Sequence, residues 1–142
     1  MADTNSLRVR LVTPDRIFIE GTADSVSLPS RSGYLEVLYR HAPLLAELGA
    51  GEVTIHGGDI GDRTLFVARG FVEVLPDRVT ILAETAMPLN EINAGDARQE
   101  LEHGQRMWNE AGEESKRYAE ANRVIREAEE RLAAAQGAED SA

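Results

Sequence analysis

The hydrophobic pattern of this chain changes its period close to Pro88, and this change limits the fold more than any other feature. Before it, residues 7–86 form short β-branched runs separated by turn residues, a pattern typical of antiparallel sandwiches and barrels. After it, Ala, Glu, Gln and Arg dominate, which favours helix. We therefore predict an α+β chain, mainly β and then α, with a β-domain over residues 1–87 and a helical domain over residues 88–142.

The clearest element of the β-half is a hairpin in "GFVEVLPDRVTILAE", which begins at Gly70. Valines alternate with a glutamate before the Pro76-Asp77 turn, and Val79 and Ile81 alternate with other residues after it. One face of this pair is expected to be core. The glycine cluster "GGDIGD" lacks the Lys-Ser/Thr of a phosphate-binding loop, so we predict a hairpin turn there instead.

Each of the two predicted helices carries one apolar seam, with residues recurring at steps of four and three. The seam residues are Ala97, Leu101, Gly104 and Trp108 in the first helix, and Tyr118, Ala121, Ile125, Ala128 and Leu132 in the second. Gly112 separates the two stretches, so we predict an antiparallel two-helix hairpin, with an acidic tail over residues 137–142 that frays. Because most seam residues are small, the hairpin is expected to be marginally stable alone, needing a partner or being able to come apart.

Composition excludes several classes of partner and chemistry. The formal net charge of -10 opposes binding to nucleic acid and to anionic membrane surfaces. The chain has no cysteine, which rules out disulfides, a thiolate nucleophile and a cysteine-based zinc site, and favours a reducing compartment. No stretch approaches the ~20 apolar residues that span a bilayer, so direct membrane insertion is not expected.

Signals of catalysis are weak. The histidines His41, His56 and His103 show no paired metal-ligand spacing, and no G-x-S-x-G motif is present. We predict no catalytic residue, no metal site and no cofactor. Carboxylates and cations of the helical half mix at i,i+4 spacing, which favours a solvated surface, although four arginines are also candidates for docking on an acidic partner. These are Arg117, Arg123, Arg126 and Arg131.

The stretch "YLEVLYRHAPLLAEL" over residues 34–48 favours presentation of a surface over catalysis. His41 is expected to cap a bend by hydrogen-bonding nearby backbone, with Pro43 fixing the local φ. Leu44 and Leu45 cannot both point into a thin core, so one of them is expected to join an exposed apolar patch.

The order of these features resembles the epsilon subunit of the bacterial rotary ATP synthase. The similarity rests on "VTP" at 12–14, "VSLP" at 26–29, "HAPLL" at 41–45, "GFVEV" at 70–74 and "DRVTILAETA" at 77–86, followed by the helical hairpin. It covers nearly the whole chain.

The resemblance implies a sandwich of about ten strands at the foot of the central stalk, bound to the gamma subunit and the membrane rotor ring (c-ring). It implies that the helices can extend toward the alpha and beta subunits and restrain ATP hydrolysis, and that the chain carries no active site. It further implies a monomer when isolated, and a peripheral place at the cytoplasmic face of the inner membrane within the proton-translocating complex. The residues implied at the gamma and rotor interface are Tyr34, His41, Ala42, Pro43, Leu44 and Leu45.

Two departures from the family pattern carry consequences. Family members usually read Gly-Glu-Leu-Gly-Ile-x-Pro-Gly before the histidine, whereas here Tyr34 replaces the rotor-facing acid and Tyr39-Arg40 replaces Pro-Gly. Some relatives bind ATP through Ile/Leu-Asp-x-x-Arg-Ala, where this chain has Asn93 for the acid and Asp96 for the arginine. Because an aspartate repels phosphate, we predict that ATP is not bound tightly.

Two other hypotheses remain open at this point. The first is an adaptor in which a β-sandwich recognition module carries a coiled-coil-type interaction hairpin. The second is a hydrolase built on the sandwich, for which the only argument is the number of carboxylates.

Overall fold

The computed structural model describes residues 6–141, with the side chains of residues 6–137. The chain divides into two compact units, Met1–Pro88 and Leu89–Ala142. The predicted frayed tail over residues 137–142 lies largely outside the described side chains, although the backbone of the last helix is continuous to Ser141.

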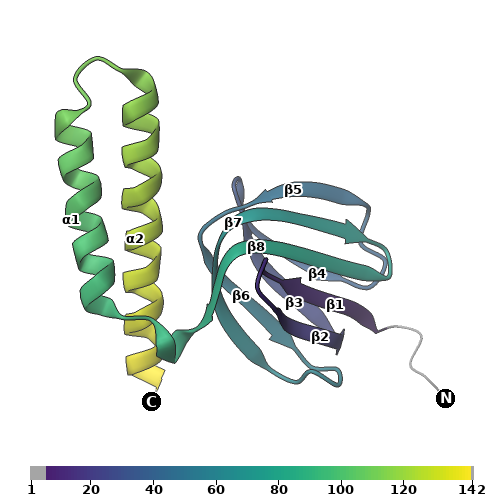
Figure 1. Cartoon of the computed structure of the whole chain (residues 1–142). Coiled ribbons are helices and arrows are strands. Elements are labelled where there is room, and N and C mark those ends of the chain that lie inside the picture. Colours follow the sequence, from purple (N-terminus) through teal and green to yellow (C-terminus); the bar gives the residue numbers. More distant parts are fainter. Residues whose placement is uncertain (1–5, 142) are drawn as a thin grey trace. The chain divides into compact units, whose positions relative to one another are not determined.

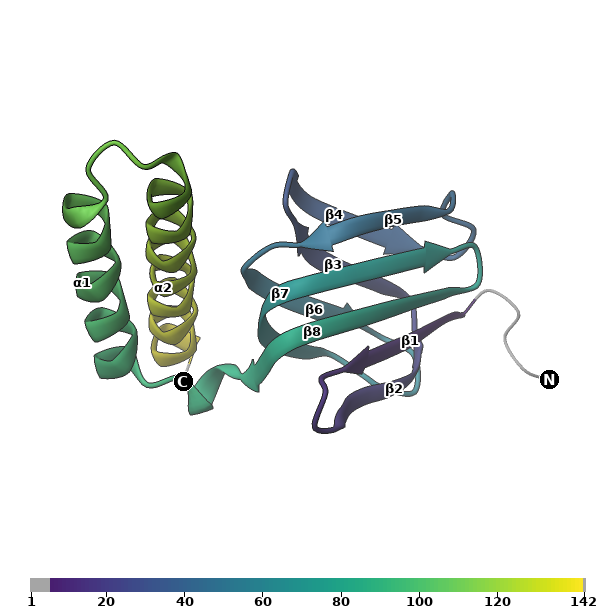
Figure 2. The ribbon, with the colours of Figure 1, turned by 45° about the horizontal axis from the view of Figure 1, so that its top comes forward.

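The first unit is an eight-stranded sheet folded into two layers (Figures 1 and 2). One layer runs in the pairing order β2-β1-β8-β7-β5, and β3, β4 and β6 form the other, with β6 joined to both β3 and β7. The strands are β1 (Leu7–Val12), β2 (Ile17–Ala23), β3 (Ser25–Ser30), β4 (Gly33–Leu38), β5 (Leu44–Leu48), β6 (Gly51–His56), β7 (Arg63–Leu75) and β8 (Arg78–Pro88).

The β-sandwich is confirmed, with eight strands where about ten were expected, because two long strands pass from one layer to the other. The first half of β7 pairs with β6 and its second half pairs with β5. The strand bends between them at Arg69 and Gly70, whose φ angles are 63° and 143°. A Cβ at Gly70 would collide with the carbonyl oxygen of Leu82, so this crossing requires glycine.

One pair of strands departs from the antiparallel expectation. β1 lies parallel to β8, with Arg8 beside Arg78 and Leu11 beside Ile81. Parallel neighbours need a long connection, and the remaining strands of the sandwich supply it. The local hairpin signals in the sequence could not reveal a pairing between strands so far apart.

The core lies between the two layers and is aliphatic. Along the predicted 70–84 hairpin, Val72, Val74, Val79 and Ile81 are buried, which confirms that one face of this pair is core. The alternation continues in β1, where Leu7, Val9 and Leu11 are buried and the residues between them are outward.

The glycine cluster is a turn between β6 and β7, as predicted, and it packs on the end of β2. The backbone N–H of Thr22 donates to Asp59 Oδ1 at 2.6 Å, and the Asp59 N–H donates to Thr22 Oγ1 at 3.2 Å. The hydrogen bond from the Thr22 backbone is the main reason that the pKa of Asp59 lies below its usual value.

The second unit contains a short 3₁₀ turn, η1 (Leu89–Glu91), and two antiparallel helices, α1 (Ala94–Glu110) and α2 (Ser115–Ser141) (Figure 1). Asn93 caps α1, because its side chain accepts a hydrogen bond from the N–H of Asp96 at 3.0 Å. Gly112 follows the end of α1 with a φ of 62°, the left-handed conformation in which helices commonly end.

The helices pack through very small residues. Ala97 and Gly104 on α1 and the C-cap residue Ala111 are buried at intervals of seven residues, and Ala121 and Ala128 are buried at the same interval on α2. The larger seam residues Leu101, Tyr118, Ile125 and Leu132 are only partly buried.

Trp108 differs from its seam neighbours, since 45% of its surface is exposed. The edge of its ring packs against Tyr118 with ring centroids 4.7 Å apart. At Gly104, one turn earlier on α1, the helices are so close that even a Cβ would lie 2.7 Å from Ile125 Cγ1.

Candidate interaction surface

The outer face of the layer β5-β7-β8-β1-β2 carries an unusual number of exposed apolar side chains. Phe71, Leu82 and Ile17 are 52%, 51% and 51% exposed, and Leu45 is 71% exposed. Phe71 pairs with Leu82 across β7 and β8, Leu82 pairs with Val12 on β1, and Val12 pairs with Ile17 on β2. These pairings line up Phe71, Leu82, Val12 and Ile17 across four strands, a set called here the apolar row.

Two strands are apolar on both faces at the row, because Leu82 directly follows the buried Ile81 and Val12 directly follows the buried Leu11. Ile81-Leu82 is an apolar pair in the sequence, and Leu11-Val12 is another. In a strand with one solvated face, such pairs break the expected alternation of apolar and polar residues. The apolar row was not predicted from the sequence, although these pairs of adjacent apolar residues are the signal that marks it.

Two residues further along the same face, the paired residues of β7, β8 and β1 are polar, and only the residue on β5 is apolar. Leu45 pairs with Glu73 and Thr80 pairs with Arg10. Arg10 forms an ion pair with Glu20 at 3.2 Å. The exposed position of Leu45 agrees with the expectation that one of the two leucines of "HAPLL" lies on an apolar surface, and Leu44 is the less exposed of the two at 36%.

The loop that carries His41 joins β4 to β5 and is fixed by backbone contacts. The N–H of His41 donates to the Leu38 carbonyl at 3.0 Å, and His41 Nδ1 lies 2.7 Å from the Ala42 carbonyl oxygen. The N–H of Arg40 donates to the Pro76 carbonyl at 2.6 Å. His41 therefore occupies a bend next to the β7–β8 turn, in the structural role expected for it.

Tyr34 lies apart from the other residues assigned by resemblance to the gamma and rotor interface. It sits near the beginning of β4, whereas His41, Ala42, Pro43 and Leu44 follow the end of that strand, about 15 Å away at the rise of a β-strand. Its ring is 58% exposed, and its hydroxyl accepts a hydrogen bond from the Glu52 N–H at 3.0 Å. The residues assigned to this interface therefore lie at opposite ends of β4, with Tyr34 at one end and the His41 loop at the other.

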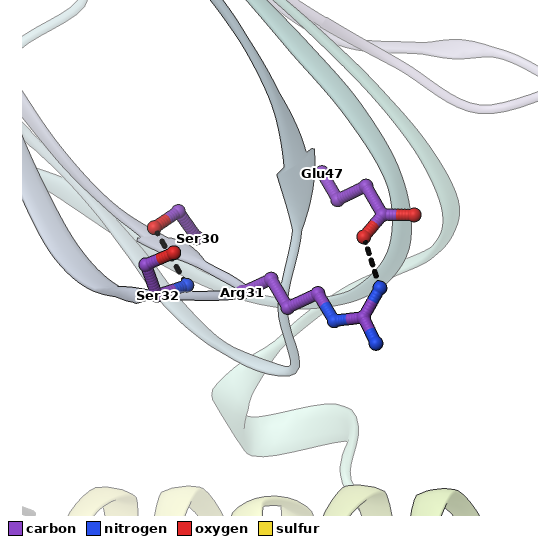
Figure 3. Close-up of polar contacts among 4 residues, drawn as sticks. All are labelled: Ser30, Arg31, Ser32 and Glu47. Carbon is purple, nitrogen blue, oxygen red and sulfur yellow. Dashed lines mark hydrogen bonds and ion pairs between the residues drawn. The ribbon is translucent and has the colours of Figure 1, made fainter.

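The turn beside Tyr34 is held by several polar contacts (Figure 3). Arg31 Nη1 donates to Glu47 Oε2 at 2.7 Å, and the Ser32 N–H donates to Ser30 Oγ at 3.2 Å. The hydrogen bond to Glu47 raises the pKa of Arg31. These contacts fix the β3–β4 turn against the end of β5.

The four arginines proposed as contacts for an acidic partner do not share one face of α2. At 100° per residue, Arg123 and Arg126 lie about 140–160° from the line of buried alanines, and Arg117 and Arg131 lie within about 60° of it. Arg117 is paired with Glu114 at 2.9 Å. Arg131 is partly buried, with a buried Nε that has no hydrogen-bond partner among the described residues.

Within the described residues, no cluster of three or more His, Asp or Glu side chains is arranged to hold a metal. Over the same residues, no helix is long and apolar enough to cross a membrane. A shallow groove of about 440 Å³ lies along the helical hairpin and is lined by Gln105, Trp108, Asn109, Asn122 and Ile125.

The sandwich that carries these surfaces matches a known protein family. Residues 6–89 match the family described as the ATP synthase delta/epsilon chain, beta-sandwich domain. The chain belongs to the ATP synthase delta/epsilon family. The resemblance noted in the sequence is therefore confirmed, and membership in this family favours the ATP synthase hypothesis over an adaptor or a hydrolase.

Several bacterial members of the family are similar over most of their length. The ATP synthase epsilon chain of Halalkalibacterium halodurans is 39% identical over 127 residues, which cover 89% of this chain and 95% of that one. The ATP synthase epsilon chain of Koribacter versatilis is 39% identical over 116 residues, which cover 80% of this chain and 78% of that one.

A solved structure, the mitochondrial ATP synthase assembly of Euglena gracilis with OSCP, F1 and c-ring, contains a chain of the same fold. The TM-score is 0.76 at 17% identity, covering 92% of this chain and 81% of that one. The central stalk and c-ring structure of the Tetrahymena thermophila enzyme contains another, with a TM-score of 0.60 at 14% identity, covering 92% of this chain and 99% of that one.

Proposed function

We propose that this member of the family is a rotor subunit of the central stalk of a proton-translocating ATP synthase, without an active site of its own. Its sandwich binds the gamma subunit and the membrane ring, and its helices restrain ATP hydrolysis. It works at the cytoplasmic face of the inner membrane as a peripheral part of the complex, and it is a monomer when isolated. The apolar row is the single observation that carries the proposal.

The apolar row has the properties of a protein interface. Leu82 and Val12 lie on β8 and β1, which are inner strands of their layer, so the row extends over several strands. Phe71, Leu82 and Ile17 each expose about half of their surface, and burying that half is worth about 1 kcal/mol per side chain. Such a contiguous apolar surface is a typical docking site.

The loop containing His41 extends the proposed gamma-binding surface. It joins β5, whose Leu45 projects from the same face as Phe71 and Leu82. Tyr34 and the β3–β4 turn form a second exposed place at the other end of β4, and we assign this place to the membrane ring. Two separate contact places suit a subunit that connects two partners.

The helical hairpin suits a regulatory element because little free energy holds its helices together. Its fully buried contacts are alanines and one glycine, and these contribute much less burial than leucine or isoleucine would. Two arrangements of such helices can differ by only a few kcal/mol. Arg123 and Arg126 project away from the line of buried alanines, which makes them the better placed of the four arginines to contact the alpha and beta subunits.

Co-purification tests the proposed membership of the rotor. An affinity-tagged chain, expressed in its own host, should recover the gamma, alpha and beta subunits in fixed stoichiometry from solubilised membranes. A Phe71→Ser, Leu82→Ser variant should recover much less of all three, while an Arg63→Ser control on an exposed position of β7 should behave like the wild type. Recovery of the tagged wild-type chain without gamma would overturn the proposal.

A further inference from the structure

Three arginines surround the turn between β7 and β8. Arg8 and Arg78 are direct neighbours on parallel strands, and both point outward because Val9 and Val79 beside them are buried. The Arg8 N–H donates to the Asp77 carbonyl at 3.0 Å, and the Arg40 N–H donates to the Pro76 carbonyl at 2.6 Å. Arg8, Arg40 and Arg78 are called here the arginine cluster.

The arginine cluster is not fully neutralised within the described part of the chain. Elsewhere in the sandwich, Arg10 pairs with Glu20 and Arg31 pairs with Glu47. No ion pair in the described residues involves a member of the cluster, and the Arg40 guanidinium lies 5.7 Å from the centre of the Tyr39 ring. The Asp59 carboxylate accepts a hydrogen bond from the Thr22 backbone, and the charge of Arg8 makes a further, smaller contribution to its lowered pKa. Arg8 is therefore partly balanced by Asp59 without a direct ion pair.

The placement of Arg8 and Arg78 has no evident structural benefit. Like charges on adjacent sheet positions destabilise the pair. Charged residues often protect the edges of sheets from aggregation, but β1 and β8 are inner strands, so edge protection does not apply here. In a chain with a formal net charge of -10, three arginines at one turn that form no direct ion pair among the described residues are best explained by a partner.

We propose that the arginine cluster is a docking site for a carboxylate-rich segment of the gamma subunit. The inference rests on the proposed function, since it names the chemistry of the partner at one end of the same surface. Arg78 and Leu82 lie on the same face of β8, about 13 Å apart at the rise of a β-strand, so one partner can cover both. The cluster orients the partner and speeds its association, while the apolar row supplies most of the affinity.

A protein carboxylate suits the cluster better than a lipid phosphate. The negative charge of the whole chain repels an anionic bilayer, and its three arginines are fewer than the four to eight basic residues of a typical lipid-binding cluster. A protein segment that is already held by the apolar row needs only a few local charges to fix its orientation.

The test is a titration of the full chain with purified cognate gamma subunit over a range of salt concentrations. The variant Arg8→Gln, Arg40→Asn, Arg78→Gln removes three charges, and asparagine tolerates the left-handed backbone at residue 40. We expect the variant to bind about tenfold more weakly at about 50 mM NaCl and within about twofold of wild type at about 500 mM. Its thermal midpoint should stay close to that of wild type, because relief of the repulsion between Arg8 and Arg78 offsets the lost attraction of Arg8 to Asp59.

An Arg63→Gln control, at an exposed position of β7 away from the cluster, should retain wild-type affinity at both salt concentrations. Equal binding of wild type and the triple variant at low salt would overturn the inference but leave the proposed function intact if Phe71→Ser, Leu82→Ser still weakens binding. Failure of the wild-type chain to bind gamma would overturn both. Retention of wild type, but not the triple variant, on vesicles with about one-third phosphatidylglycerol would assign the cluster to lipid instead and contradict the inference.

Discussion

At the scale of single residues, the most informative position is Arg40. It has a φ of 74°, a left-handed conformation that side chains with a Cβ rarely adopt. In the family pattern described above, glycine is usual at this position, so the arginine places strain in the loop beside His41. The Arg40 guanidinium belongs to the proposed docking site, which suggests that the strain is tolerated for binding.

Replacing Arg40 by glycine should therefore stabilise the isolated chain. Relief of the left-handed conformation is worth about 1–2 kcal/mol, and the added flexibility of the unfolded chain offsets about 0.5–1 kcal/mol of that gain. We expect a net increase of about 0.5–1 kcal/mol in the free energy of unfolding, measured by urea denaturation. Arg40→Ala is the matched control, since it loses the same guanidinium but keeps the Cβ and should show no gain. Equal stability of the two variants would indicate that the loop is not strained.

Asp59 predicts a second residue-level effect, which depends on pH. The pKa of Asp59 is lowered in the folded chain, chiefly by the hydrogen bond from the Thr22 N–H. The ionised carboxylate therefore stabilises the fold above the unfolded pKa of about 3.9. This contribution is lost as the pH falls through the lower pKa of the folded chain. Asp59→Ala should be less stable than wild type at pH 7, and the difference should narrow between about pH 5 and pH 3.

The measurement is the thermal midpoint of the two chains across this pH range. Asp59→Asn is the control, because it keeps an acceptor oxygen but does not titrate, and its difference from Asp59→Ala should not change with pH. A constant difference between wild type and Asp59→Ala from pH 7 to pH 3 would contradict the assigned role of the carboxylate.

At the scale of elements, the strands, turns and helices that depend on local sequence pattern could be predicted, whereas pairings between strands distant in the sequence could not. Alternation and the Pro76-Asp77 turn predicted the β7–β8 hairpin, and the steps of three and four predicted both helices. The parallel neighbour of β8 could not be inferred, because no local signal marks the pairing of β1 with a strand near the end of the sandwich.

The candidate surface was only partly predictable for the same reason. "HAPLL" predicted that one of its two leucines joins an exposed apolar patch, and Leu45 on β5 is indeed exposed. The apolar row joins residues of four strands, so its extent became visible only once the register was known. The separation of Tyr34 from His41 likewise follows from the length of β4 and not from either residue.

The close approach of the two helices at Gly104 gives a prediction at this scale. A Cβ there would lie 2.7 Å from Ile125 Cγ1 and 3.1 Å from the Ile125 backbone nitrogen. Gly104→Ala should gain up to about 1 kcal/mol of helix propensity but lose about 1–3 kcal/mol through overpacking, whereas Gly137→Ala, with open space around its Cβ, should only gain.

Thermal unfolding followed by circular dichroism at 222 nm, a wavelength sensitive to helix, distinguishes the two glycines. We expect the helical signal of Gly104→Ala to be lost at a lower temperature than that of Gly137→Ala. If Gly104→Ala were stabilised as much as Gly137→Ala, the helices could not be packed as closely as described.

At the scale of the whole molecule, the two units are proposed to have different tasks, with adhesion in the sandwich and restraint of hydrolysis in the helices. The sandwich has its own buried core, and β8 is complete at Pro88, where the first unit ends. A chain that ends after Pro88 therefore keeps every strand of the sandwich.

Truncation after Pro88 should separate these tasks. In an ATP synthase reconstituted with the truncated chain, ATP hydrolysis should rise severalfold over the enzyme with the full chain, because the restraint of about 1–2 kcal/mol typical of regulatory coupling is removed. The amount of chain bound per complex, measured by quantitative gel analysis, should stay the same. Unchanged hydrolysis at full occupancy would contradict a restraining role for the helices.

The most direct test of the proposed rotor role is cysteine labelling. Because the chain has no cysteine, a variant with a single introduced cysteine reports the exposure of that one position. Leu82→Cys places a thiol in the apolar row, and Arg63→Cys places one at an exposed position of β7 outside it. If the row is the gamma-binding surface, adding cognate gamma should slow maleimide labelling of Leu82→Cys by about tenfold or more and leave Arg63→Cys unchanged. Labelling of Leu82→Cys at the same rate with and without bound gamma would contradict the assignment of this face to the rotor.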